Sequence, residues 1–154
     1  MKNLGKRCTA GLIGIAASAA LVTPAFAGSA AGSGAGAITA HGRGAAQLSG
    51  DVDAMGISGT GVLVVVDNAG DAHVAISGHG VVRVSGHTRT YIGFNGRARI
   101  SGSNVTVKLV GENVTLAARG DGSFVLKGTG TYDTKPGAAG GEGTWSRTGT
   151  SGEF

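Results

Sequence analysis

The chain has 154 residues, of which 31 are glycine and 41% are hydrophobic, and it carries 13 Lys and Arg against 9 Asp and Glu. Three of those cations lie in a predicted leader, so the rest of the chain has a net charge of only +1. This balance argues against nucleic acid as a partner, because nucleic-acid binding calls for a strongly basic surface. The one cysteine, Cys8, also lies in the leader, so disulfides cannot hold the remaining fold together.

Residues 1–27 have the features of a secretory signal peptide. Three cations in the first seven residues precede an apolar stretch at 11–22, and the tripeptide Ala-Phe-Ala ends at Ala27. The apolar stretch is about twelve residues long, shorter than the roughly 20 that span a bilayer, and no later segment is apolar enough to span one. We therefore predict cleavage near Ala27 and a secreted, periplasmic or cell-surface protein that does not span a membrane.

The rest of the chain divides into three predicted parts. Residues 28–41 are low-complexity Gly, Ala and Ser, which is typical of a flexible linker. Residues 42–133 form a β-repeat domain punctuated by glycine. Residues 134–154 are a Gly-rich C-terminal tail, in which residues 143–148 either form a last strand or fray.

A short unit recurs through the repeat domain. An apolar residue is followed two places later by glycine. Two of the intervals between these apolar residues are about twice as long as the others, and when each of the two is counted as two steps the average interval is about 8.7 residues. The apolar positions are Leu48, Ile57, Ile76, Val84, Ile100, Leu109, Ala118 and Leu126. Each unit is too small to bury an apolar face alone, so the units must pack on one another.

Within the units, apolar residues alternate with polar ones. The alternating sets are Val74/Ile76, Val82/Val84, Ala98/Ile100, Val105/Val107/Leu109, Val114/Leu116/Ala118 and Phe124/Leu126. A period of two in short segments rich in Val and Ile predicts strands with one buried face. Corners such as Gly102-Ser103-Asn104 and Gly111-Glu112-Asn113 join them, since Gly and Asn accept positive φ. The chain is therefore predicted to be all-β.

Two architectures fit this unit. In the one that we favour, a β-solenoid or β-roll of about ten short strands, two units make a coil of about 17 residues and each strand stacks in parallel on the next coil. In the alternative, an antiparallel β-meander folded into a sandwich or barrel, each corner is a hairpin. In both, the break at Tyr91-Ile92-Gly93-Phe94 predicts a bulge or a wider corner.

The alternation also predicts which charged side chains point outward. The outward cations are Arg83, Arg99, Lys108, Arg119 and Lys127. In a solenoid, Arg83 and Arg99 are one coil apart and lie side by side, which makes a basic stripe suited to an anionic polysaccharide, with Tyr91 stacking on a sugar ring. The competing interpretation is that these charges keep the strand faces solvated and block aggregation.

The sequence carries no recognisable catalytic or metal site. It lacks a nucleophile elbow and a phosphate-binding loop, and its four histidines are not spaced to converge on one ion with a carboxylate. We expect no enzyme activity and no cofactor. The chain is predicted to be a secreted structural or cell-surface, adhesin-like protein that can self-associate; the alternative is an extracellular module that binds anionic polysaccharide of the cell envelope or its surroundings.

Overall fold

The structure, a computed structural model, describes residues 36–135 and 141–154. The predicted signal peptide at 1–27 and the first part of the predicted linker lie outside the described residues. Within them, no helix has the length and apolar character needed to cross a membrane.

Two very long strands make up most of the all-β fold. They are β1 (Gly36–Asp67) and β3 (Thr88–Lys135), and the shorter β2 (His73–Ser85) lies between them in the sequence. The chain ends with β4 (Gly141–Thr144) and β5 (Thr150–Glu153). Because β1 begins at Gly36, it takes in the last six residues of the segment expected to be linker. In the expected C-terminal tail, where the sequence predicts a last strand or fraying at 143–148, the structure has the two short strands β4 and β5.

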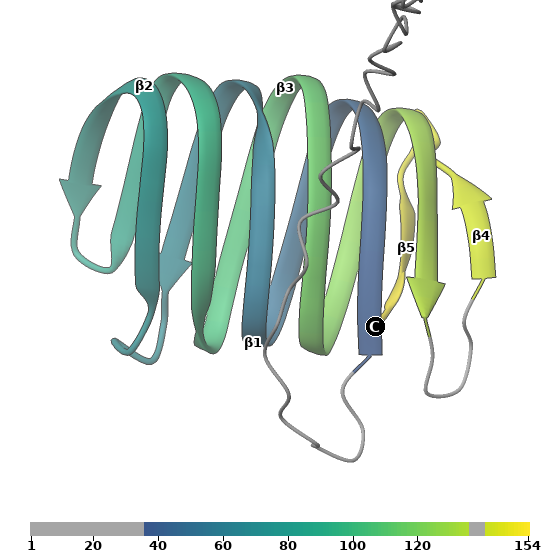
Figure 1. Ribbon diagram of the computed structural model, residues 1–154, viewed down its shortest axis with the longest axis horizontal. Helices are drawn as coiled ribbons and strands as arrows, with labels where there is room; N and C mark the ends of the chain where they lie inside the picture. Colours follow the sequence, from purple (N-terminus) through teal and green to yellow (C-terminus); the bar gives the residue numbers. More distant parts are fainter. Residues whose placement is uncertain (1–35, 136–140) are drawn as a thin grey trace, which may run out of the picture. The chain divides into compact units, whose positions relative to one another are not determined.

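All five strands belong to one open sheet in which the named strands pair antiparallel. The order is β1-β3-β2, with β4 and β5 also paired to β3. The strand β1 has β3 on both of its sides: Ile38 lies opposite both Ala118 and Thr134. Both long strands therefore bend repeatedly, and the windings of β1 alternate with those of β3 (Figure 1).

The predicted parallel solenoid is therefore wrong. The strands β1 and β2 wind in the same direction, and the chain reverses at residues 86–87, so the windings of β3 run opposite to those of β1 and β2 beside them. The antiparallel pairing of the alternative is present, but its hairpin at every corner is not. Most corners are bends inside a continuous strand, whereas residues 86–87 form a hairpin at which consecutive units pair, with Ser85 opposite Thr88.

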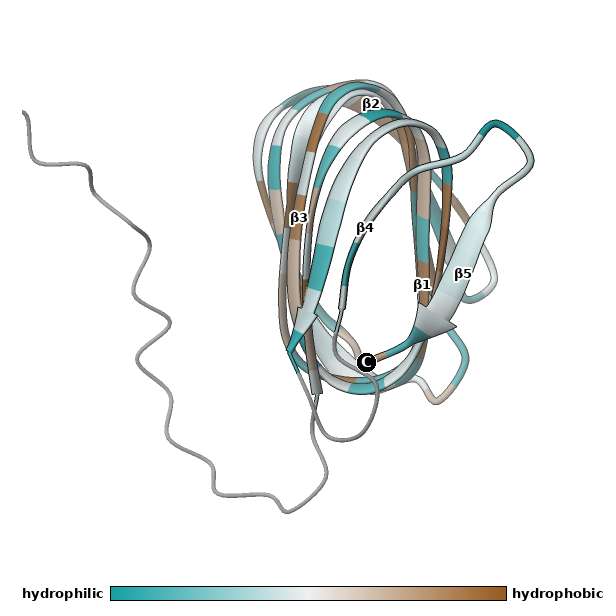
Figure 2. Cartoon of the chain, turned by 90° about the vertical axis from the view of Figure 1, so that its right-hand side faces the viewer, coloured by the Kyte–Doolittle hydropathy of each residue, from teal (hydrophilic) through white to brown (hydrophobic). Residues whose placement is uncertain are grey.

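The bends divide the sheet into two walls that face each other across the core (Figure 2). The first wall consists of residues 37–42, 54–59, 73–78, 95–101, 114–119, 131–135 and 141–144. The second wall consists of residues 45–50, 62–67, 81–85, 88–92, 105–110, 123–127 and 150–153.

Alternate residues of both walls form the core. Val105, Val107 and Leu109 are fully buried, as the period of two predicts. The same holds for the sets at 98–100, 114–118 and 124–126. The pattern is wrong only for β2, where Val82 and Val84 are 52% and 66% exposed. The reason is that β2 is the last strand of the sheet and has no further winding beside it.

The corners use the residues that the sequence indicated. Asn104 and Asn113 have φ of 47° and 53°, the positive values that asparagine tolerates better than other side chains. The expected irregularity near Phe94 is also present. Opposite it, the pairing of β2 jumps between His79 and Val81, so that one residue of β2 faces two of β3 in a bulge.

Acidic side chains stabilise the corners by accepting backbone hydrogen bonds. The amide of Asn104 donates to Asp51 Oδ1 at 2.7 Å, and that of Ser103 donates to Asp71 Oδ1 at 2.9 Å. The hydrogen bonds from Ser103 hold the pKa of Asp71 below its usual value of 3.8, because they favour the charged carboxylate. The acids that the sequence places near corners therefore have a structural use.

Candidate functional site

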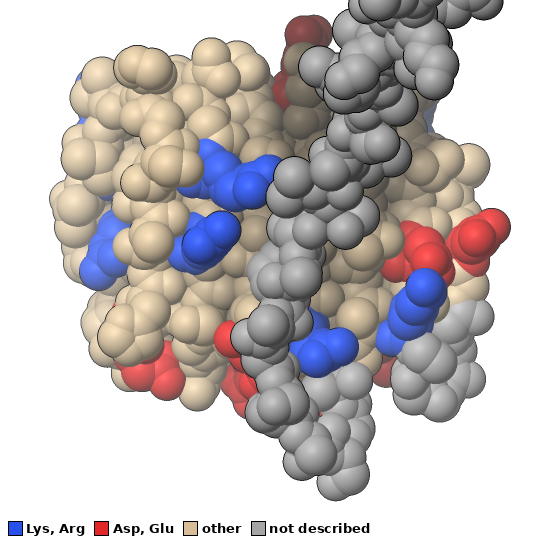
Figure 3. Space-filling view, in the orientation of Figure 1, with Lys and Arg blue, Asp and Glu red and all other residues tan. Residues whose placement is uncertain are grey.

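The outward side of the first wall carries three arginines. Arg97 and Arg99 lie on one stretch of β3, two positions apart, and both are exposed. Arg119, also exposed, lies two strands further on. From the spacing of strands and residues, the Cα atoms of Arg99 and Arg119 are roughly 12 Å apart. We call Arg97, Arg99 and Arg119 the arginine group; Figure 3 shows blue side chains over the middle of this face.

Small residues separate the members of this group. Arg99 lies opposite Ala75 on one side and Gly56 on the other, and Arg119 lies opposite Ala54 and Ala37. Side chains this small leave the guanidinium groups room to reach a ligand lying flat on the wall.

The predicted basic stripe does not stay together. Arg99 and Arg119 belong to the first wall, whereas Arg83, Lys108 and Lys127 are exposed on the second. Arg83 and Arg99, expected to lie side by side, instead pair with different residues on opposite walls. The chain reverses at residues 86–87 between them, so a separation of 16 residues does not bring them together.

Tyr91 does not lie on an outward face beside the predicted cations. It lies opposite the buried Leu63 and is itself half-buried, packed against the core. Its ring is therefore on the inward side of the second wall. Sequence reasoning missed Arg97, although its position two residues before Arg99 on a strand predicts the same face.

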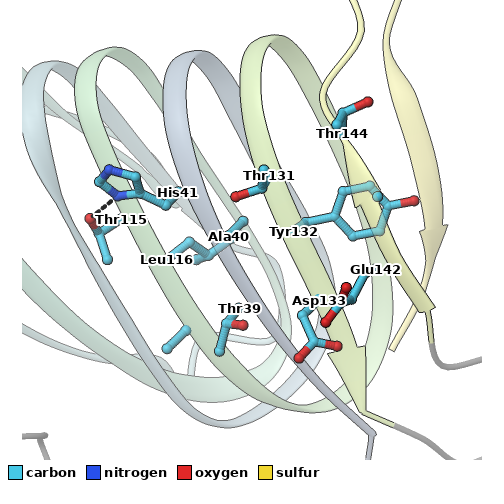
Figure 4. A pocket seen from close by; sticks show the side chains of 12 residues that line it. Thr39, Ala40, His41, Thr115, Leu116, Thr131, Tyr132, Asp133, Glu142 and Thr144 are labelled. Carbon is cyan, nitrogen blue, oxygen red and sulfur yellow. Dashed lines mark hydrogen bonds between the residues drawn. The ribbon is translucent and has the colours of Figure 1, made fainter.

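A shallow hollow of about 690 Å³ lies on the first wall next to β4 (Figure 4). Its polar lining comes from three strands, and the imidazole of His41 is joined to the hydroxyl of Thr115 by a hydrogen bond of 2.9 Å between Nδ1 and Oγ1. Asp133 lies opposite Glu142 in the pairing of β3 with β4. The lining residues with polar side chains are Thr39, His41, Thr115, Thr131, Tyr132, Asp133, Glu142 and Thr144.

The hollow offers hydrogen-bonding groups rather than a metal centre. Hydroxyls, an imidazole and two carboxylates can together hold the hydroxyl groups of a polar ligand. In the part of the chain that the structure describes, no three His, Cys, Asp or Glu side chains are grouped to hold a metal ion. The first wall is thus basic at the arginine group and mixed in charge near β4, where Asp133, Glu142 and the exposed Lys135 lie.

These features define an all-β protein with one wound antiparallel sheet, whose first wall is polar on its outer side and whose second wall exposes Val62, Ile92 and Val110 among its polar side chains. No family model, no curated protein and no solved structure matches the chain. The function is therefore argued from the walls themselves.

Proposed function

We propose that the protein is an exported, non-enzymatic structural or cell-surface protein that works through the outer walls of its sheet. The observation that supports this proposal is the use made of the side chains. Inward residues are occupied in packing, and outward residues form regular rows across neighbouring strands. One such row of the first wall runs through Ser58, Thr115, His41 and Thr131 in successive pairings.

The surroundings of His41 suit binding better than catalysis. The hydrogen bond of His41 goes to the hydroxyl of Thr115, whereas a general base is normally oriented by a carboxylate. A flat wall with polar rows suits contact with an extended surface better than enclosure of a small substrate.

The test is retention of the purified protein on insoluble cell-envelope material. A structural or surface protein is expected in the bound fraction after washing, and heat-unfolded protein processed in parallel controls for trapping. Recovery of all the folded protein in the wash, at both low and moderate salt, would contradict the proposed function.

A second candidate function, binding of anionic polysaccharide, is favoured by the arginine group. Three exposed charge contacts at about 0.2–1 kcal/mol each amount to between about threefold and about 150-fold in affinity. Such binding weakens as the ionic strength rises from about 0.05 M to about 0.5 M, since the screening length falls.

A matched pair of triple variants tests this candidate. Replacing Arg97, Arg99 and Arg119 by Ser is expected to release the protein from an acidic polysaccharide resin at lower salt. The control removes the same charge from the other wall, by replacing Arg83, Lys108 and Lys127 by Ser, and is expected to elute like the unaltered protein. Equal losses in both variants would show that net charge alone causes retention and would refute a site on the first wall.

A further inference from the structure

The strand β2 ends the sheet with an apolar edge. It pairs with β3 on one side only, so the backbone groups of its other side have no strand partner within the sheet. Three valines on this strand are the most exposed large apolar residues of the described chain: Val81, Val82 and Val84 at 65%, 52% and 66%. A long unpaired strand with exposed valines is a template for pairing with another strand.

The opposite end of the sheet is protected. It is closed by β4 and β5, which have four residues each and carry Glu142 and Glu153. Trp145 between them and Phe154 after them are buried, at 5% and 9% exposure. Short strands and charges discourage edge pairing. The end formed by β4 and β5 is therefore less suited to pair with another strand than the end formed by β2.

Many pairings inside the molecule bring like residues together at the bends. Corner glycines lie opposite corner glycines in several of them, as in Gly42 with Gly130 and Gly59 with Gly96, although Gly42 also lies opposite Val114 on its other side. Inward residues lie opposite inward residues, as in Leu48 with Val107. Both conditions keep the bends aligned and the core continuous from one winding to the next.

We propose that β2 pairs antiparallel with β2 of a second copy of this chain, about a two-fold axis at His79. This register places Gly78 opposite Gly80 of the second copy at the bend. It places Ile76 opposite Val82, and Val74 opposite Val84, so that the inward apolar residues of the two copies continue one core. Glycine opposite glycine and inward residue opposite inward residue, as in pairings inside the molecule, thus continue across the interface.

Neighbouring registers satisfy fewer of these conditions. Moving the axis to Gly78 leaves Ile76 opposite Gly80, and moving it to Gly80 leaves Val82 opposite Gly78. A shift that places the axis between residues sets inward side chains opposite outward ones and breaks the wall.

The polar side chains on this edge are compatible with the same register. Arg83 lies opposite the uncharged Ala75 of the second copy, so like charges do not face each other. Asp71 and His87 flank β2 at eight positions on either side of His79, and both are exposed. The two-fold axis therefore brings the carboxylate end of one edge toward the imidazole end of the other.

Each copy uses its β2 edge in the interface and leaves only its protected end free, so a third copy has no β2 edge to pair with. The expected product is a dimer rather than a filament. The proposal rests on the structural function for its biological role. Its test measures mass and cross-linking, whereas the test of that function measures retention on envelope material, so either can fail alone.

Light scattering after size-exclusion chromatography measures the mass. The protein is expected to elute at twice the mass of one chain. Replacing both Val82 and Val84 by Lys is expected to yield the monomer, and replacing Val62 and Val110 by Lys, two valines exposed on the second wall at 36% and 45%, is expected to leave the dimer. Monomeric unaltered protein, equal dissociation by both double variants, or masses that rise beyond the dimer with concentration would each overturn the proposal.

Cysteine cross-linking tests the register. In a Cys8→Ser background, the cysteine of His79→Cys in one copy lies opposite the same cysteine of the second copy. Cα atoms directly opposite each other on antiparallel strands are about 4.5–5.5 Å apart, which is within disulfide range. Rapid formation of a disulfide dimer is expected, while Val110→Cys in the same background is expected to stay reduced. A dimer in which the cysteines at position 79 do not cross-link would overturn the register.

Discussion

The bend at Gly42 gives the sharpest test of how closely the windings pack. A Cβ atom added at Gly42 would lie 2.5 Å from the carbonyl oxygen of Thr129 and 2.8 Å from the Cα of Gly130. Both are backbone atoms of the neighbouring winding, so a side-chain rotation cannot relieve the overlap. For Gly42→Ala, the neighbouring winding must move by at least about half an ångström, and we expect a loss of about 2–3 kcal/mol in the free energy of unfolding.

Two control variants separate this overlap from other effects of replacing glycine. Gly141→Ala adds a Cβ with no atom within 4 Å, so it is expected to be neutral or to stabilise by up to about 1 kcal/mol, since the unfolded chain loses freedom. Gly86→Ala is equally open but has φ of +56°, and it is expected to cost up to about 1 kcal/mol net.

Urea unfolding followed by circular dichroism measures all three variants. The expected order of stability is Gly141→Ala, then Gly86→Ala, then Gly42→Ala, with similar urea dependence throughout. If Gly42→Ala is as stable as Gly141→Ala, the windings are not in contact at this bend and the reasoning is refuted.

Three further predictions follow from single contacts. Because the pKa of Asp71 is depressed below 3.8, its carboxylate stabilises the folded protein above that pH, and this stability is lost as the pH falls below it. Asp71→Asn is therefore expected to flatten the acid side of the stability curve measured between pH 5 and pH 2. An unchanged acid side would contradict the role of Ser103. Trp145, whose Nε1 donates to the carbonyl of Thr131 at 3.1 Å, is expected to give a blue-shifted emission that moves to the red on unfolding, and an emission maximum typical of water in the folded protein would show that it is not buried. Asn113→Val is expected to lower the free energy of unfolding in urea by about 1–2 kcal/mol, because the φ of 53° at this position is costly for a β-branched residue. Asn113→Gly is expected to cause no such loss, and equal stabilities of the two variants would contradict the positive φ at this bend.

Local features of the fold were predictable from the sequence because they depend on neighbouring residues. Val105, Val107 and Leu109 alternate with polar residues, and the structure buries all three. Asn104 and Asn113 follow glycine at a fixed distance, and both adopt positive φ. Alternation and corner chemistry act within a few residues, so they can be identified without knowing the rest of the fold.

The direction of the neighbouring strand was not predictable in this way. A repeat of about 17 residues places residue i near residue i+17 whether the two windings touch or a reversed strand lies between them. Ser49 shows the difference, because it lies opposite Thr106 and Ser123 rather than Val66. The reversal that decides the matter occupies only residues 86–87, between β2 and β3.

The predicted alignment of the basic stripe was wrong for the same reason. The predicted stripe assumed that Arg83 and Arg99 were neighbours, and its division between two walls follows from the reversal between them. The hollow beside β4 joins His41 to Tyr132 and Glu142, residues from three strands that no local spacing connects.

Disulfide formation at Ser49 tests the antiparallel winding most directly. In a Cys8→Ser background, Ser49→Cys combined with Thr106→Cys places two thiols where the hydroxyl oxygens are 3.1 Å apart, and an intramolecular disulfide is expected. Ser49→Cys combined with Val66→Cys places them two strands apart, at about 10 Å, and no disulfide is expected. Formation of the second disulfide but not the first would contradict the account, because it would place windings of the same strand side by side in parallel.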